Sequence, residues 1–333
     1  MNETLSDARN VYVAGTGSYL PSRVLTNADL EHMVDTSDEW IRTRTGIRER
    51  RLAADGEATS DMASEAARCA LDNASLSAED IDLLLVATIT PDMVFPSTAC
   101  FVQAKIGAKN AFCCDVEAAC SGFVYALEAA RCFCSAGGCK TALVIGADKM
   151  SAIVDWEDRA TCVLFGDAAG AFVLRAGKKD GGILATVLGA DGGMADLLTL
   201  PGGGSCHPAS RATVENRMHY VKMEGNTVFK QAVRYMSDTE QQALERAGLS
   251  LADVDWIVPH QANLRIIRAV ADRLRVPMEK FCVNMDRVGN TTAASVPLAL
   301  DEAVRDGRVK KGDVVLFTVF GGGLTWGATV LRY

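Results

Sequence analysis

Cys120 has the surroundings that nucleophilic chemistry requires. It follows an apolar stretch, residues 111–116, that is typical of a strand, and it directly precedes an alanine-rich helical stretch that begins near Ser121. A thiol just before a helix faces unpaired backbone N–H groups and the positive end of the helix dipole, and both favour the nucleophilic thiolate. The small neighbours Ala119 and Gly122 permit a tight turn and close approach by a substrate. A buried structural cysteine fits the same turn almost as well, so Cys120 alone does not decide between the two.

Two polar residues from the second half of the chain could assist such a nucleophile. His260 follows a buried apolar stretch, at the end of the strand where α/β sheets present functional groups. Asn290 follows Gly289 in a turn. A lone histidine after a strand is more often structural, and asparagine after glycine is a common turn device. Taken together, Cys120, His260 and Asn290 indicate an active site much more strongly than any one of them does.

A run of three glycines, residues 321–323, follows the last buried apolar stretch of the chain. Glycines allow backbone N–H groups to come close to a ligand oxygen, as an oxyanion hole requires. A tight turn between two strands is the alternative interpretation of this run.

The elements that position these residues belong to an internal repeat. Two copies of one pattern are offset by 173 residues (243 − 70), and alanine, leucine, serine and aspartate recur in place. The register holds over three pairs of segments, 70–85 with 243–258, 126–130 with 299–303, and 141–145 with 314–318. Such a long repeat, present twice, indicates two fused copies of one domain rather than a solenoid. We expect the two halves to be residues 1–178 and 179–333.

The repeat register places the candidate residues in corresponding loops. Position 120 matches position 293, so Cys120 and Asn290 lie in equivalent loops of the two copies. His260 matches Ala87, so only one half carries the imidazole. Because a pseudo-twofold axis brings equivalent loops together, we expect these side chains to meet at one site.

Each copy is predicted to contain a helix, a strand, a helix and a strand. In the first copy these are residues 60–73, with Ser60 as a plausible N-cap, and then residues 81–88, 121–135 and 141–146. Continuous apolar strands are typical of parallel sheets that are covered on both faces. The pattern therefore predicts an α/β fold in which the central helices of the two copies lie back to back.

Composition limits the classes of function. The 333 residues are 49% hydrophobic and 23% charged, which is typical of a globular chain with a large core. A net charge of −8 argues against a nucleic-acid partner. The N-terminus has no apolar run like that of a signal peptide, and the longest apolar stretches have the length of strands. We therefore expect a cytoplasmic protein without a membrane partner.

The cysteines and histidines are not spaced like metal ligands. Eleven cysteines are present, but they form no paired C-x-x-C set, and the four histidines are scattered. Apart from Cys120, the cysteines are interpreted as small buried hydrophobic residues. The sequence also has no glycine-rich dinucleotide fingerprint. We therefore expect neither a metal nor a redox cofactor.

With these motifs, the sequence resembles the β-ketoacyl-acyl carrier protein synthase III family over nearly the whole chain. The resemblance rests on seven signatures that occur in order: DEWIRTRTGI at 38–47, FPS at 95–97, AACSGF at 118–123, FGD at 165–167, PHQAN at 259–263, GNT at 289–291 and FGGG at 320–323. It implies a thiolase-like, five-layered αβαβα fold made of two duplicated halves, which agrees with the repeat.

The resemblance also implies an activity. Members of the family condense an acyl-coenzyme A primer with malonyl-acyl carrier protein, releasing coenzyme A and CO₂, and so begin fatty-acid synthesis. It implies a catalytic triad of Cys120, His260 and Asn290, with an acyl group carried on Cys120. No cofactor is implied, because loss of CO₂ drives the condensation. Bulky Phe95 suggests a short primer such as acetyl.

Further residues receive roles from the resemblance alone. Trp40 and Arg159 would surround the adenine of coenzyme A, and Arg44 would lie near its phosphates. Gly322 would add a backbone donor to that of Cys120 in the oxyanion hole. Phe95 would shape the acyl pocket across a homodimer interface.

A basic helix face fits the carrier protein, which is acidic in this family. In segment 263–276, Arg265, Arg268 and Arg275 fall on one side of a helical wheel, and the resemblance implies that Arg265 contacts the carrier protein. A plain solvated arginine face is the alternative.

Three other functions are alternatives to this interpretation. A starter-unit synthase or acyltransferase of a secondary-metabolite pathway could keep the same triad. A non-catalytic partner of a carrier protein would be expected to have lost Cys120, His260 or Asn290. A cysteine hydrolase would have no use for donors that support decarboxylation. Thiolases proper use a second, C-terminal cysteine, and elongating ketosynthases use two histidines; this sequence has neither feature.

Overall fold

The computed structural model describes residues 9–177 and 181–333 and shows a layered α/β fold. Its first half contains β1 (Val11–Tyr19), β2 (Arg23–Thr26), α1 (Asn27–Glu31), α2 (Asp38–Thr45), β3 (Glu49–Leu52), α3 (Thr59–Ala74), β4 (Leu83–Ala87), α4 (Thr98–Ile106), β5 (Phe112–Val116), α5 (Gly122–Ser135), β6 (Thr141–Asp148), α6 (Arg159–Cys162) and β7 (Ala168–Ala176). Its second half contains β8 (Gly182–Ala190), β9 (Leu198–Thr199), α7 (Arg211–Glu215), β10 (Lys222–Met223), α8 (Gly225–Ala247), β11 (Trp256–Pro259), α9 (Leu264–Leu274), α10 (Met285–Val288), α11 (Ser295–Arg305), β12 (Val314–Gly321) and β13 (Thr325–Arg332).

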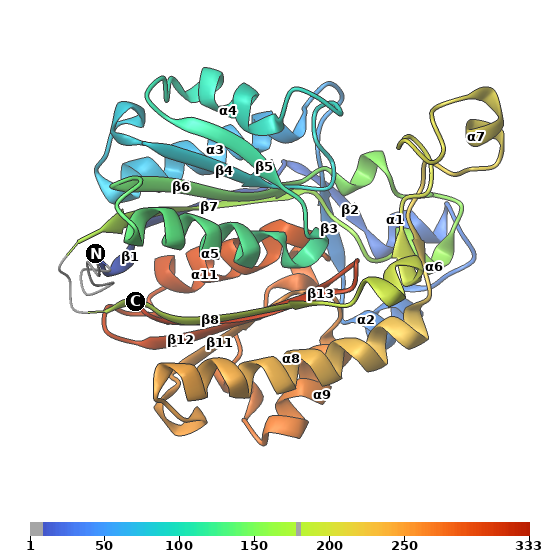
Figure 1. Ribbon diagram of the computed structural model, residues 1–333. Coiled ribbons are helices and arrows are strands. Elements are labelled where there is room, and N and C mark those ends of the chain that lie inside the picture. Colours follow the sequence, from blue (N-terminus) through green and yellow to red (C-terminus); the bar gives the residue numbers. More distant parts are fainter. Residues whose placement is uncertain (1–8, 178–180) are drawn as a thin grey trace.

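Five layers are stacked in the order helices, sheet, helices, sheet, helices (Figure 1). Helices α3 and α4 cover the outer face of one sheet, and α8 and α9 cover the outer face of the other. Helices α5 and α11 lie between the sheets, so the prediction of back-to-back central helices is confirmed. The predicted αβαβα fold is therefore the observed one.

The internal repeat is visible in the element boundaries. Strands β6 and β12 begin at residues 141 and 314 and end at residues 148 and 321, and helices α5 and α11 begin at residues 122 and 295. All three pairs keep the predicted offset of 173. The boundary expected between residues 178 and 179 falls outside the described residues, and it stays a prediction.

The two sheets share one strand order. The first runs β1-β7-β6-β4-β5 and the second runs β8-β13-β12-β11, which are the equivalent strands. The place of β5 is taken in the second sheet by an isolated parallel bridge between Ile257 and Phe281. Strand β4 pairs in parallel with β5 and β6, as its continuous apolar sequence predicts, whereas β7 and β13 are antiparallel to their neighbours. The sheets are therefore mixed, and every residue of β4, β6 and β12 is buried.

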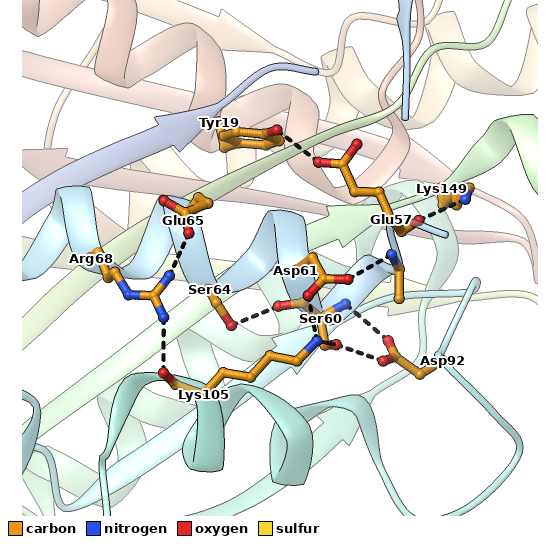
Figure 2. Close-up of polar contacts among 11 residues, drawn as sticks. Tyr19, Glu57, Ser60, Asp61, Ser64, Glu65, Arg68, Asp92, Lys105 and Lys149 are labelled. Carbon is orange, nitrogen blue, oxygen red and sulfur yellow. Dashed lines mark hydrogen bonds and ion pairs between the residues drawn. The ribbon is translucent and has the colours of Figure 1, made fainter. Parts of the chain in front are cut away.

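Ser60 does not cap helix α3, contrary to the sequence-based expectation. The helix begins at Thr59 with Ala58 as its N-cap, so Ser60 lies inside the first turn. Figure 2 shows that the backbone N–H and hydroxyl of Ser60 both donate to Asp92, at 2.9 and 2.5 Å, while Lys105 Nζ donates to the Ser60 hydroxyl at 2.6 Å. A carboxylate from a distant loop thus satisfies a backbone donor that local capping would otherwise serve.

Among the described residues, none of the helices combines the length and the apolar character that crossing a membrane would take.

Gly17 allows strand β1 to lie directly against helix α3. A Cβ atom at this position would come within 2.5 Å of the Ala66 carbonyl oxygen and would also overlap the backbone of Ala70. We expect Gly17→Ala to lower the free energy of unfolding by about 1–3 kcal/mol, because the helix must move off the sheet. Gly192→Ala is the matched control, since a Cβ there would meet nothing within 4 Å. Equal denaturation midpoints for the two variants would contradict the prediction.

Candidate active site

A cavity of about 600 Å³ lies where the two halves meet and contains all three candidate catalytic residues. Cys120 comes from the first half, and His260 and Asn290 come from the second half. Each side chain is almost completely buried, with 6%, 3% and 6% of its surface exposed, respectively. The tertiary structure thus brings together the three residues that the sequence singled out.

The backbone around Cys120 leaves a hydrogen-bond donor free. Cys120 lies in a short 3₁₀ turn, η2 (Ala119–Ser121), that leads into α5, and Ala119 has a left-handed φ of 47°. Its counterpart in the other half, Thr292, has a φ of 50°. The Cys120 backbone N–H meets its own thiol, and within the described part of the chain it makes no backbone hydrogen bond to another element. A Cβ at Gly321 would lie 2.8 Å from this nitrogen, so only glycine leaves the donor accessible.

The equivalent donor in the second half is already occupied. The Ala293 N–H, which corresponds to that of Cys120, donates to the Asp148 carboxylate at 3.2 Å. Asp148 corresponds to Gly321 under the offset of 173. At this position of the repeat, the first half has Asp148, which accepts a hydrogen bond from the Ala293 N–H. The second half has Gly321, which leaves space beside the Cys120 N–H. The Cys120 N–H can therefore donate a hydrogen bond to a developing oxyanion.

His260 is held by its backbone and by its ring. Its N–H donates to the Thr318 carbonyl oxygen at 2.8 Å, and its Nδ1 lies 2.7 Å from the Ser295 hydroxyl. Burial lowers the pKa of His260 to about 3, so the imidazole is neutral near neutral pH.

Asn290 presents its amide nitrogen to the cavity. Its Oδ1 accepts a hydrogen bond from the Thr292 N–H at 2.9 Å, which leaves Nδ2 as the group available to a ligand. The backbone of Asn290 is fixed by hydrogen bonds to the segment before β7, from its N–H to Leu164 at 2.8 Å and from the Gly166 N–H to its carbonyl oxygen at 3.0 Å. The loop is thus held in place from both sides.

Trp40, Arg44 and Arg159 gather near the cavity. Trp40 and Arg44 line it, and the Arg44 guanidinium lies 4.5 Å from the centre of the indole ring. The Arg159 guanidinium lies 4.8 Å from the same ring and donates to the Asp35 carbonyl oxygen at 2.7 Å. Two cations and an aromatic surface suit a ligand that combines a base with phosphates.

Comparison with known proteins identifies the family. A family model described as 3-oxoacyl-[acyl-carrier-protein (ACP)] synthase III matches residues 114–192, and its C-terminal counterpart matches residues 244–333. A β-ketoacyl-[acyl-carrier-protein] synthase III from Xylella fastidiosa strain 9a5c is 56% identical over 96% of this chain and 98% of its own length. The chain belongs to the β-ketoacyl-[acyl-carrier-protein] synthase III family.

Solved structures agree with this assignment. The 3-oxoacyl-[acyl-carrier-protein] synthase III of Aquifex aeolicus superimposes with a TM-score of 0.90 at 51% identity, covering 97% of this chain and 100% of that one. The priming β-ketosynthase of the R1128 polyketide pathway has the same TM-score at 37% identity, covering 98% and 97%. As the resemblance implied, the chain is an acyltransferase with a thiolase fold that condenses an acyl-coenzyme A primer with a malonyl-acyl carrier protein.

The expected bias of Cys120 toward thiolate is wrong for this structure. Burial, together with the nearby Asp148 carboxylate, raises the pKa of the thiol to about 12. The loss of hydration is the largest cause, and it outweighs the lowering of the pKa by the Cys120 backbone N–H. The resting pair in this family member is therefore a neutral thiol and a neutral imidazole.

Phe95, Gly322 and Arg268 do not line the cavity of their own chain, whereas Arg265 does. Phe95 does not line it and is 82% exposed. Gly321 lines the cavity rather than Gly322, which follows it. Arg265 lines the cavity and packs over the Phe229 ring, with 5.6 Å from the guanidinium carbon to the ring centre. Arg268 lies one turn further along α9 and is exposed.

No group of three or more histidine, cysteine, aspartate or glutamate side chains could hold a metal ion within residues 9–177 and 181–333.

Sequence reasoning missed two buried residues that organise the site. Ser295 contacts the His260 ring, and Asp148 accepts hydrogen bonds from both halves. The donors to Asp148 are the hydroxyls of Thr88, Thr90 and Thr292 and the N–H groups of Ile89 and Ala293. The repeat could have revealed both, because Ser295 and Asp148 face glycines, Gly122 and Gly321, at the equivalent positions.

The raised pKa of Cys120 can be measured by alkylation. We expect the rate at which iodoacetamide modifies Cys120 to keep rising from about pH 7 to about pH 10, because the thiolate fraction grows throughout this range. Peptide mapping separates Cys120 from the exposed Cys206, which serves as the control for reagent integrity. A plateau of the Cys120 rate below about pH 8 would restore the thiolate expected from the sequence.

Proposed function

We propose that Cys120 carries the acyl group in this condensation, and that His260 and Asn290 support the loss of CO₂. The observation that carries the proposal is that all three side chains line one buried cavity at the meeting point of the two halves. A cavity with little water strengthens hydrogen bonds to a developing negative charge.

The first half-reaction transfers the primer to the enzyme. The Cys120 sulfur attacks the thioester carbon of the acyl-coenzyme A, and the Cys120 N–H helps to hold the oxyanion. The second donor is proposed to be the backbone N–H of Gly322, next to the cavity-lining Gly321. The bond to the coenzyme A sulfur then breaks, and the thiol proton of Cys120 leaves with coenzyme A. Because burial keeps the resting thiol protonated, this proton moves during the attack rather than before it.

The second half-reaction forms the carbon–carbon bond. A malonyl thioester on the carrier protein loses CO₂, and its electron pair becomes an enolate whose oxygen accepts hydrogen bonds from His260 and Asn290 Nδ2. The enolate carbon attacks the acyl carbon on Cys120, the bond to sulfur breaks, and a 3-ketoacyl carrier protein is released. The Cys120 sulfur leaves as a thiolate and takes up one proton from solvent, which restores the resting thiol. Neutral His260 fits this step, since the required group is a hydrogen-bond donor.

Coenzyme A is proposed to bind at the Trp40 side of the cavity. Its adenine would stack with Trp40 and Arg159, and its phosphates would pair with Arg44. The Arg159 guanidinium lies on the indole ring in the described structure, so adenine binding would move it aside. We expect this reaction to need no metal or redox cofactor. We also expect the protein to act in the cytoplasm.

The primer is proposed to be short, with acetyl as the first choice, in fatty-acid rather than secondary-metabolite synthesis. The higher identity to a β-ketoacyl-[acyl-carrier-protein] synthase III, 56%, than to the R1128 priming ketosynthase, 37%, supports the fatty-acid role.

The exposed edge strand β5 supports a homodimer. It ends the order of the first sheet, and an open strand edge invites pairing with another chain. Exposed aromatic side chains accompany it, with Phe112 and Phe133 packed edge to face at 5.7 Å between ring centres. We propose that two copies meet here and that Phe95 of each copy reaches the acyl pocket of the other.

The exposed face of helix α9 is proposed to bind the acidic carrier protein. Arg265 lies at the cavity and Arg268 follows one turn later, so a bound carrier protein could deliver its thioester to Cys120. The enzyme itself has a net charge of −8, which makes a local basic face necessary for such a partner.

Intact mass after incubation with acetyl-, butyryl- and isobutyryl-coenzyme A tests the acyl carrier. We expect an acyl increment on the wild type and none on Cys120→Ala, because the latter lacks the nucleophile. The coenzyme A that gives the fullest increment defines the primer. An equal increment on both proteins would place the acyl group on another residue.

Arg265→Glu tests the carrier-protein surface. We expect the KM for malonyl-acyl carrier protein to rise about tenfold or more, because a charge pair becomes a repulsion, while acylation by acyl-coenzyme A stays near the wild-type rate. Arg246→Glu, at the far end of α8, is the matched control for the change in net charge. Equal losses in both half-reactions would show that Arg265 acts elsewhere.

A further inference from the structure

The ring of His260 makes one side-chain hydrogen bond among the described residues, and its partner is Ser295 at the start of helix α11. The distance from His260 Nδ1 to the Ser295 hydroxyl oxygen is 2.7 Å. Both residues are buried, with 3% and 1% of their surface exposed. The Ser295 hydroxyl and the Nδ1 atom of His260 are therefore both buried, and each depends on the other as its hydrogen-bond partner.

The direction of this hydrogen bond is decided by the hydroxyl proton of Ser295, which requires an acceptor. A buried hydroxyl has one proton to donate, and within the described residues the His260 ring is the only side-chain or backbone group that bonds to the Ser295 oxygen. If the ring donated from Nδ1, the hydroxyl proton would be left without an acceptor, which is costly in a buried site. The hydroxyl therefore donates to Nδ1, and the neutral ring carries its proton on Nε2.

The internal repeat supports a functional origin for this pair. At the equivalent positions of the first half stand Ala87 in place of His260 and Gly122 in place of Ser295. The two positions are neighbours in the first half as well, since a Cβ added at Gly122 would lie 3.2 Å from the Ala87 Cβ. Only the half with the imidazole carries the hydroxyl.

We propose that Ser295 is a positioning residue that holds His260 in the neutral Nε2–H form, so that the ring acts toward the cavity as a donor. Burial keeps the ring neutral, and Ser295 decides which nitrogen bears the proton. The inference deepens the proposed function: the Nε2–H would meet the malonyl thioester oxygen, while acyl transfer to Cys120 needs no such donor.

Nitrogen NMR of protein labelled with ¹⁵N-histidine reads the tautomer directly, and His260→Gln identifies the signal among the four histidines. We expect the His260 proton on Nε2 in the wild type and a mixture of tautomers in Ser295→Ala. A wild-type proton on Nδ1, or an unchanged tautomer in Ser295→Ala, would overturn the proposal. This measurement uses no substrate, so it stands even if Cys120 proves not to carry the acyl group.

The two half-reactions give the functional readout. We expect Ser295→Ala to slow decarboxylation of malonyl-acyl carrier protein by about 10- to 100-fold, as loss of an orienting partner does elsewhere, with acyl-Cys120 formation close to the wild-type rate. The decarboxylation rate of Ser295→Cys, whose thiol is a weaker donor of similar size, should fall between the rates of the wild type and Ser295→Ala. Equal slowing of both half-reactions would indicate a merely structural role for Ser295.

Ser237→Ala is the matched control. Ser237 is also a buried helical serine, and its hydroxyl donates to the Val233 carbonyl oxygen within α8 at 2.9 Å. Neither Ser237 nor Val233 lines the cavity. We expect this variant to keep the wild-type His260 tautomer and both rates. A tautomer change in Ser237→Ala equal to that in Ser295→Ala would show that the effect comes from general loosening of the core and would overturn the proposal.

Discussion

The Asp148 carboxylate, buried between the halves, holds the active-site loops in register. It accepts hydrogen bonds from the loop after β4 in the first half and from the turn after Asn290 in the second half. A buried donor left unpaired costs about 1–3 kcal/mol. Separating the two loops would break hydrogen bonds to this shared acceptor and would therefore destabilise the fold. The turn that follows Asn290 is therefore fixed against the loop after β4. At the equivalent position, Gly321 leaves the Cys120 N–H open.

Burial sets the electrostatics of the cavity. It raises the pKa of Cys120 to about 12 and lowers that of His260 to about 3, so neither group is charged at rest. A site of neutral groups with free N–H donors responds most strongly when negative charge appears on a substrate oxygen. Both half-reactions proposed for this protein create such a charge. The site is suited to hold that oxyanion, not a resting thiolate.

The duplicated halves have diverged into different tasks. The first half supplies the proposed nucleophile just before α5, and the second supplies the two proposed hydrogen-bond donors and the basic helix α9. The scaffold that carries them has changed little, because both sheets keep one strand order and both central helices start at equivalent positions. Replacing single side chains, as at the pairs His260 and Ala87 or Ser295 and Gly122, was enough to separate the roles.

The sequence by itself determined the repeat, the layered α/β class and the three residues of the cavity, because these depend on periodic apolar patterns and on residues that stand out at strand ends. It did not determine the charge state of Cys120, since hydration of a thiol depends on everything packed around it. It also missed Ser295 and Asp148 and assigned Ser60 a capping role, because each of these side chains bonds to groups distant in the chain. Only the tertiary structure could decide such contacts, as hydrogen bonds over long sequence separations leave no local pattern.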